Sequence, residues 1–82
     1  MPQVSRDQVL KTIAGALQVG EEQITEDTSA DDLGEWDSIG HLGILSDLDQ
    51  VLDGAAAEIE ALASADSVSK ILSALGLHGL VE

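Results

Sequence analysis

The chain has 82 residues and a formal net charge of −13, from 16 acidic and 3 basic side chains. It is short enough to form one domain around a single core. Its charge would repel the phosphates of nucleic acids and an anionic membrane surface, so neither is an expected partner. The absence of cysteine excludes thiol catalysis, disulfides and thiolate metal sites. The abundance of leucine, isoleucine and valine predicts a folded all-α domain rather than a disordered chain.

No stretch of the sequence has the features of a targeting or membrane segment. The beginning, MPQVSRDQVL, lacks both the basic start and the apolar run of a signal peptide. No apolar run approaches the roughly 20 residues that cross a bilayer. We therefore expect a monomeric, cytoplasmic protein whose partners carry basic surfaces.

The first expected helix covers residues 4–17, where apolar side chains recur every three or four positions. Ser5 is its expected N-cap, and Gly20 is expected to close it. Residues 20–36 show no helical period and are expected to form one long loop, a feature that is often functional in a small domain. Two apolar side chains are expected to hold this loop against the core, namely Ile24 and Leu33.

Three further helices are expected in the second half of the chain. The second begins at Asp37 or Ser38 and ends at a Gly54 C-cap. A short helix covers 55–63, and the last runs from about residue 66, capped by Ser64 or Asp66, to Leu75, with Gly76 ending it and the remaining tail fraying. The apolar positions of the second helix are Ile39, Leu42, Ile44, Leu45, Leu48, Val51 and Leu52. The expected architecture is a small bundle of three main helices plus one short helix.

The segment LGEWDSIGHL, residues 33–42, places a serine at the start of the second helix, directly after the acidic loop. One interpretation is that Ser38 or Asp37 simply caps the helix. The other is that the Ser38 hydroxyl lies beside free backbone N–H groups that can receive a phosphate, which suits covalent phosphoryl attachment. Spacing alone leaves both interpretations open.

Self-contained catalysis and metal binding are not expected. Ser38 and His41 are three residues apart, but the WDSIG context lacks the first glycine of a G-x-S-x-G elbow, and no strand is predicted to support one. The aspartates at 47, 49 and 53 lack the glycine that an EF-hand loop requires.

The Asp37-Ser38-Ile39 triplet, in the context WDSIGHL, is similar to the phosphopantetheine attachment motif of acyl carrier proteins, whose core is Asp-Ser-Leu. The length, acidity, long loop and helix order also resemble this family over about residues 5–76. The resemblance implies a single acyl-carrier-like domain over residues 1–82. The WDSIGHL context is more similar to carriers of specialised pathways than to the housekeeping carrier of fatty acid synthesis.

The resemblance implies that Ser38 carries 4′-phosphopantetheine, transferred from coenzyme A by a phosphopantetheinyl transferase. The thiol of this arm would hold acyl groups as thioesters, so the protein would be a carrier and not an enzyme. Its other partners would be acyl-loading and acyl-transfer enzymes of fatty acid, polyketide or other specialised biosynthesis, with basic docking patches. Asp37 would help the transferase position its metal and coenzyme A. The residues expected beside the arm are Trp36, Asp37, Ile39 and His41, and those expected to bind partners are Glu35, Asp37, Leu42, Asp47 and Asp49.

Gly40 and Gly43 depart from the family pattern, because carriers of fatty acid synthesis usually have acidic residues there. The glycines are either tolerated surface changes or positions that open space beside the arm and alter docking. Two other functions remain open. One is a peptidyl or aminoacyl carrier, whose serine more often follows glycines, and the other is an unmodified acidic helical module that binds a basic protein.

Overall fold

Four α-helices make up most of the computed structural model, which describes residues 4–81. The main helices are α1 (Arg6–Leu17), α2 (Ser38–Val51) and α4 (Val68–Leu77), and α3 (Glu60–Ala63) is a single turn. Over this range the backbone forms no strand, only isolated bridges. The predicted all-α bundle of three main helices plus one short helix is confirmed. None of the helices within the described range is long and apolar enough to cross a membrane.

Helix α1 follows the predicted Ser5 N-cap and ends at Leu17, the last residue of the predicted segment, but its C-cap is Gln18 and not Gly20. The Ser5 hydroxyl accepts a hydrogen bond from the Gln8 N–H at 3.1 Å, which caps the helix. Gln18 adopts the left-handed conformation, with φ of 59°, and the Val19 N–H bonds to the Ala14 carbonyl at 3.0 Å. This arrangement satisfies the last carbonyls before Gly20 is reached.

The long loop is ordered by two 3₁₀ turns, η1 (Glu21–Gln23) and η2 (Ala30–Asp32), and by the buried side chain of Thr28. The Thr28 hydroxyl accepts from the Thr25 N–H at 2.9 Å and donates to the Gln23 carbonyl at 3.2 Å. The loop's own polar groups therefore hold its shape. The apolar contacts predicted for it also form, with Ile24 buried and Leu33 half-buried against the core.

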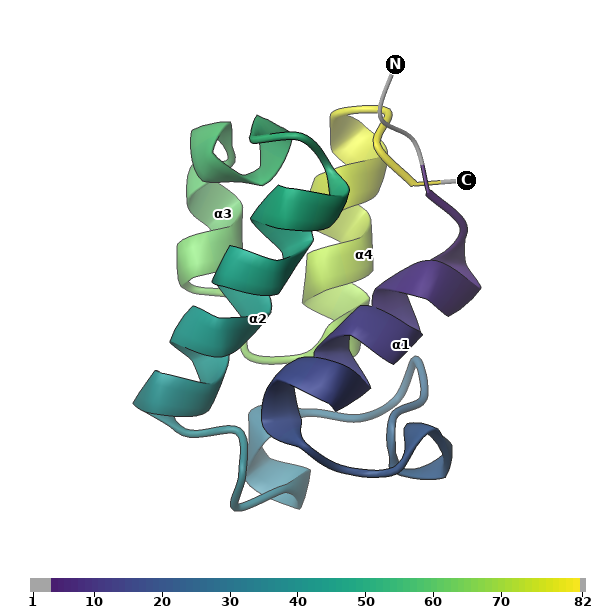
Figure 1. The fold of residues 1–82 in the computed structure, drawn as a ribbon, viewed down its shortest axis with the longest axis vertical. Coiled ribbons are helices and arrows are strands. Elements are labelled where there is room, and N and C mark those ends of the chain that lie inside the picture. Colours follow the sequence, from purple (N-terminus) through teal and green to yellow (C-terminus); the bar gives the residue numbers. More distant parts are fainter. Residues whose placement is uncertain (1–3, 82) are drawn as a thin grey trace.

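The loop is joined to the start of α4 by backbone hydrogen bonds. The Ala30 N–H donates to the Asp66 carbonyl at 2.8 Å, and the Val68 N–H donates to the Thr28 carbonyl at 2.9 Å. In Figure 1 the loop closes the end of the bundle at which α2 begins. The segment that leads into Ser38 is thus fixed to two helices.

Helix α2 buries a different face from the one predicted for its first turns. Ile44 and Leu48 are fully buried, whereas Ile39 and Leu42, both predicted on the apolar stripe, are 79% and 66% exposed. The face of these turns that meets α1 consists of glycine, with Gly43 beside Ala16. The spacing rule missed this stripe because glycine does not register as an apolar position.

The segment predicted as one helix over 55–63 is divided in two. Ile59 has an extended backbone, with φ −104° and ψ 98°, and separates the 3₁₀ turn η3 (Ala55–Glu58) from α3. Ile59 and Leu62 are nevertheless the buried pair that the sequence predicts. Helix α2 ends at Val51 with Leu52 as its C-cap, and not at the predicted Gly54 C-cap. The Gly54 N–H still bonds to the Asp49 carbonyl at 2.8 Å, which closes the turn that follows the helix.

Helix α4 starts and ends later than predicted. Its N-cap is Ser67, whose hydroxyl accepts from the Lys70 N–H, and not Ser64 or Asp66. The helix continues through Gly76 to Leu77.

The tail is fixed to the bundle and does not fray as predicted. Leu80 is buried, and its carbonyl accepts a hydrogen bond from the Val4 N–H at 3.0 Å. The core therefore extends beyond residue 76. Leu80 could not be assigned to the core from helical spacing because it lies after the last helix.

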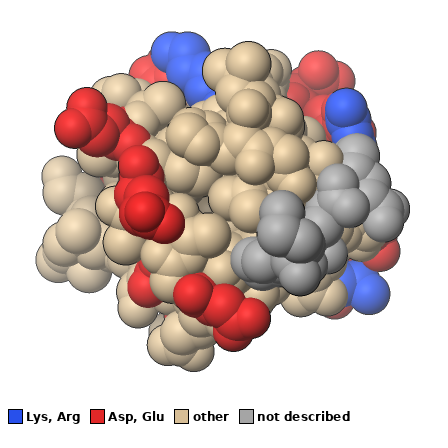
Figure 2. Space-filling view, turned by 90° about the horizontal axis from the view of Figure 1, so that it is seen from above, with Lys and Arg blue, Asp and Glu red and all other residues tan. Residues whose placement is uncertain are grey.

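Each basic side chain lies beside an acidic one, in the pairs Arg6–Glu26, Lys11–Asp7 and Lys70–Asp66, with N–O distances of 2.8, 3.7 and 2.8 Å. Figure 2 shows this on one face of the molecule, where the visible blue side chains border red ones. With 16 acidic against 3 basic residues, most carboxylates have no basic side chain to pair with. The unpaired surface carboxylates therefore repel one another and destabilise the folded state.

We expect added salt to stabilise the protein. Raising the ionic strength from about 0.01 M to 0.1 M shortens the screening length from about 30 Å to 10 Å and weakens this repulsion. A gain of about 1 kcal/mol would raise the melting temperature by roughly 4–8 °C. Thermal melts in sodium chloride and in choline chloride measure the effect, and the two salts should act alike if screening is the cause. An unchanged melting temperature would contradict it.

Candidate functional site

Ser38 is exposed at the first position of α2. Of the two residues predicted as possible N-caps, Asp37 and Ser38, it is Asp37 that caps the helix. The Asp37 carboxylate accepts a hydrogen bond from the Gly40 N–H at 2.8 Å, and the Asp37 carbonyl accepts from the His41 N–H at 2.8 Å. Across the described residues, the Ser38 hydroxyl makes no hydrogen bond. Its oxygen is therefore free of a structural role and open to solvent.

An open pocket of about 610 Å³ lies beside Ser38, between the start of α2 and the segment that connects α3 to α4. Leu42, Leu45 and Ala63 give it apolar walls, and Asp66 lies at its border. A neighbouring pocket of about 460 Å³ shares Leu45 and Ala63 with it, so the two form one furrow along α2. The furrow offers an apolar surface that begins at the serine.

Trp36 and His41 form the inner side of this pocket. Trp36 is only 5% exposed, and its indole Nε1–H donates to His41 Nδ1 at 3.1 Å. The two ring planes are inclined by 15° with centroids 6.2 Å apart, which lets the in-plane N–H meet the in-plane lone pair. The other imidazole nitrogen, Nε2, lies 2.8 Å from the Leu62 carbonyl oxygen in α3. We call this the Trp36–His41–Leu62 chain.

The structure brings together most of the residues predicted beside the arm. Trp36, Asp37, Ser38 and His41 all line the pocket. Ile39 does not line it and points to solvent, while Leu42, predicted to bind partners, does line it. Ile39 and Leu42 thus both present exposed apolar surface in the first turns of the helix that Ser38 begins.

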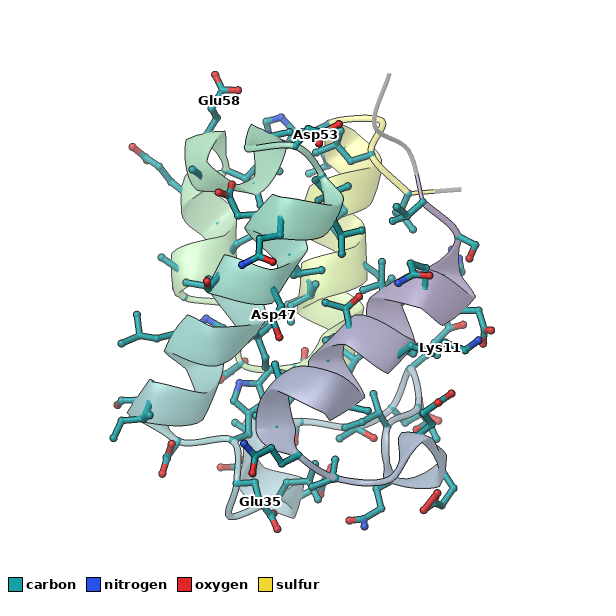
Figure 3. All side chains as sticks on the ribbon, viewed as in Figure 1. Lys11, Glu35, Asp47, Asp53 and Glu58 are labelled. Carbon is teal, nitrogen blue, oxygen red and sulfur yellow. The ribbon has the colours of Figure 1, made fainter. Side chains whose placement is uncertain are left out.

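The acidic residues predicted to bind partners do not form one cluster. Figure 3 places Glu35 in the loop at one end of the molecule and Asp47 midway along α2. Asp49 is half-buried, and its carboxylate accepts a hydrogen bond from the Ala57 N–H at 3.0 Å, which holds η3 against α2. The first turn of α2 contains no acidic residue. The carboxylates that lie by the pocket of Ser38 are therefore those of Asp37, at the helix N-cap, and Asp66, before α4.

Asp66 lines the pocket, although the sequence indicates it only as a possible helix cap. Its carboxylate bonds to the Lys70 ammonium at 2.8 Å, and this partner lowers the pKa of Asp66. A carboxyl whose pKa is depressed in the folded state stabilises the fold above its ordinary pKa, and this contribution is lost as the pH falls. The i,i+4 spacing of Asp66 and Lys70 was the available signal for this pair.

Gly40 is required by a close approach of the backbone. A β-carbon there would overlap the Glu35 carbonyl oxygen and press on Leu17 of α1. At Gly43 a β-carbon would lie 3.6 Å from the nearest atom, the Ala16 carbonyl oxygen, an ordinary contact distance. Gly40 is thus neither a tolerated surface change nor a position that opens space beside the arm, because it lets the loop reach Ser38.

The geometry does not pair Ser38 with a base on His41. Both imidazole nitrogens are engaged, one by Trp36 and the other by the Leu62 carbonyl. Residues 4–81 also contain no group of three or more His, Asp or Glu side chains placed to hold a metal ion.

No protein-family model, curated protein or solved structure gives a significant match to this chain. The features that point to a function are therefore the geometry around Ser38 and the motif in which this serine lies.

Proposed function

We propose that this protein is a carrier of acyl groups, held as thioesters on a 4′-phosphopantetheine arm attached to Ser38. The observation that supports this best is the free hydroxyl of Ser38. Asp37 caps the helix, so the serine is exposed, without a hydrogen bond and beside an apolar pocket. The serine is not needed as a cap, because Asp37 already caps the helix.

In the proposed modification, the Ser38 oxygen attacks the phosphorus of coenzyme A that bears the pantetheine. A new P–O bond forms to serine, the pyrophosphate P–O bond breaks, and adenosine 3′,5′-bisphosphate leaves while the hydroxyl proton is lost. A phosphopantetheinyl transferase would catalyse this step. The backbone N–H groups of Ser38 and Ile39 donate to no acceptor among the described residues, and the positive end of the α2 dipole favours the resulting phosphate.

The furrow along α2 fits the proposed cargo. Its walls are aliphatic, and it starts beside the serine, so an acyl chain on the arm would find apolar surface there. The partner enzymes would then contact an apolar pair, Ile39 and Leu42, next to the arm. Their basic groups would meet the more distant carboxylates and speed the encounter.

The test is the intact mass of the protein after incubation with coenzyme A and a promiscuous phosphopantetheinyl transferase. We expect a gain of one phosphopantetheinyl group in the natural sequence and none in Ser38→Ala. Ser46→Ala is the matched control, because Ser46 is also exposed on α2, and it should gain the group. Because Asp37 supplies the cap, Ser38→Ala should melt at the same temperature as the natural protein.

Failure of several transferases to modify a folded protein would overturn the carrier proposal. The unmodified acidic binding module would then be the leading alternative. If the group is gained, loading assays with acyl-loading and with amino-acid-adenylating enzymes separate an acyl carrier from a peptidyl carrier.

A further inference from the structure

The Trp36–His41–Leu62 chain fixes the protonation state of its histidine. The indole N–H of Trp36 can only donate, so His41 Nδ1 has to be the acceptor and carries no proton. The Leu62 carbonyl oxygen can only accept, so His41 Nε2 has to carry the proton. Both bonds form together only with a neutral imidazole protonated at Nε2.

The Trp36–His41–Leu62 chain of hydrogen bonds also links helix α2 to helix α3. His41 lies one turn after Ser38 in α2, and its bond to Leu62 is the only side-chain hydrogen bond from α2 to α3 among residues 4–81. Helix α3 is one turn long and packs chiefly against α4. This bond is therefore the side-chain hydrogen bond, among the described residues, that ties α3 to the helix of Ser38.

We propose that His41 is a positioning residue, which holds α3 against α2 and sets the width of the pocket beside Ser38 only while its imidazole is neutral. A proton on Nδ1 would place an N–H against the N–H of Trp36, two donors 3.1 Å apart. To part the two donors the ring would have to turn about its Cβ–Cγ bond. That turn also carries the Nε2–H away from the Leu62 carbonyl, so the bond to Leu62 would break although Nε2 keeps its proton. Acidification thus releases α3 from α2 and widens the pocket.

The charged groups around the pocket favour the released state once the proton is bound. Asp37 at the start of α2 and Asp66 before α4 line the same pocket as His41, and Glu60 of α3 lines the adjoining one. Asp66 is partly neutralised by Lys70. An imidazolium that leaves Trp36 therefore meets carboxylates at the mouth of the pocket.

The loss of the Trp36–His41–Leu62 hydrogen bonds on protonation of His41 is a property of the unmodified protein. Its use, to hold a cargo near neutral pH and release it in acid, rests on the carrier function proposed above. The NMR titration uses protein without the arm. A negative result would contradict the role of His41 and say nothing about modification of Ser38, and a negative mass measurement would contradict the carrier function and say nothing about His41.

The test is an NMR titration of the ¹⁵N-labelled, unmodified protein from pH 8 to pH 5. At pH 8 we expect the ring nitrogens of His41 to show the Nε2–H tautomer. As His41 is protonated, the indole N–H signal of Trp36 should move with the same midpoint. Protection factors, which remove the intrinsic pH dependence of exchange, should fall about tenfold for the Leu62 and Ala65 amides, the loss expected for one hydrogen bond. The amides of α1 should not follow.

Two controls separate positioning from general loss of structure. His78 is exposed outside the pocket, so its titration should move neither the indole signal nor α3. Trp36→Phe keeps a ring and removes the opposing donor, so protonation of His41 should no longer lower the Leu62 and Ala65 protection. An Nδ1–H tautomer at pH 8, or an indole signal that ignores the protonation of His41, would overturn the proposal.

Discussion

Replacing Trp36 with alanine is expected to lower the free energy of unfolding by about 3–5 kcal/mol, the usual loss when a large buried aromatic ring is removed. Trp36 is the only aromatic residue of the chain and is 5% exposed. Its removal would leave a cavity between the loop and α2 and would take the donor from His41. Urea titrations followed by far-UV circular dichroism measure this loss without depending on the indole signal.

Trp36→Phe is the matched control. It preserves most of the ring contacts and removes only the indole N–H, so its loss should be about 1 kcal/mol. The difference between the two variants reports the packing contribution of the ring. Equal losses in both would mean that the ring is not packed in solution as the structure has it.

Gly40→Ala is expected to destabilise the protein by about 1–3 kcal/mol, although alanine is the better helix former. The added methyl group would meet the backbone carbonyl of Glu35, which cannot rotate aside as a side chain can. Either the loop moves away from α2, or the first turn of α2 unwinds. Both changes displace the segment that holds Ser38, so slower phosphopantetheinyl transfer should accompany the lower midpoint of urea unfolding.

Gly43→Ala, in the same helix, is expected to change the free energy of unfolding in the opposite direction from Gly40→Ala. Its methyl group would lie at ordinary contact distance from Ala16, so the helix propensity of alanine should prevail. We expect no loss, and a gain of up to about 1 kcal/mol. If Gly40→Ala and Gly43→Ala change stability equally, the close approach of the loop to Gly40 is absent in solution.

The sequence predicts those features that depend on neighbours in the chain. Ser5 as a cap, the position of Ser38 at the start of α2 and the burial of Ile59 with Leu62 are all properties of one turn or one helix. Each follows from capping preference or apolar spacing. Such local rules also gave the order of the helices.

The predictions that were wrong concern residues at which segments distant in the sequence meet. Ile39 and Leu42 were expected in the core because they are apolar, but the face that meets α1 consists of glycines. No spacing rule marks a glycine that is needed for close packing. The buried tail residue Leu80 likewise depends on a hydrogen bond to Val4, at the other end of the chain.

The Trp36–His41–Leu62 chain of hydrogen bonds could not be predicted from the sequence for the same reason. Trp36 and His41 are close in sequence and were both expected near the arm. The third member is a backbone carbonyl 21 residues away from His41, and any residue type would supply it. Only the packing of α3 decides which carbonyl it is.

The backbone bridge between Val4 and Val81 makes residues 4–81 nearly a closed ring, and helix α2, which starts with Ser38, begins at the opposite end of the bundle (Figure 1). Because these two residues are already neighbours, joining them through a short peptide would add little loop-closure entropy. A circular permutant should therefore keep the fold, as long as the new opening spares the loop that leads into α2. A surface to which the protein is tethered near Val4 or Val81 would likewise leave the serine facing outward.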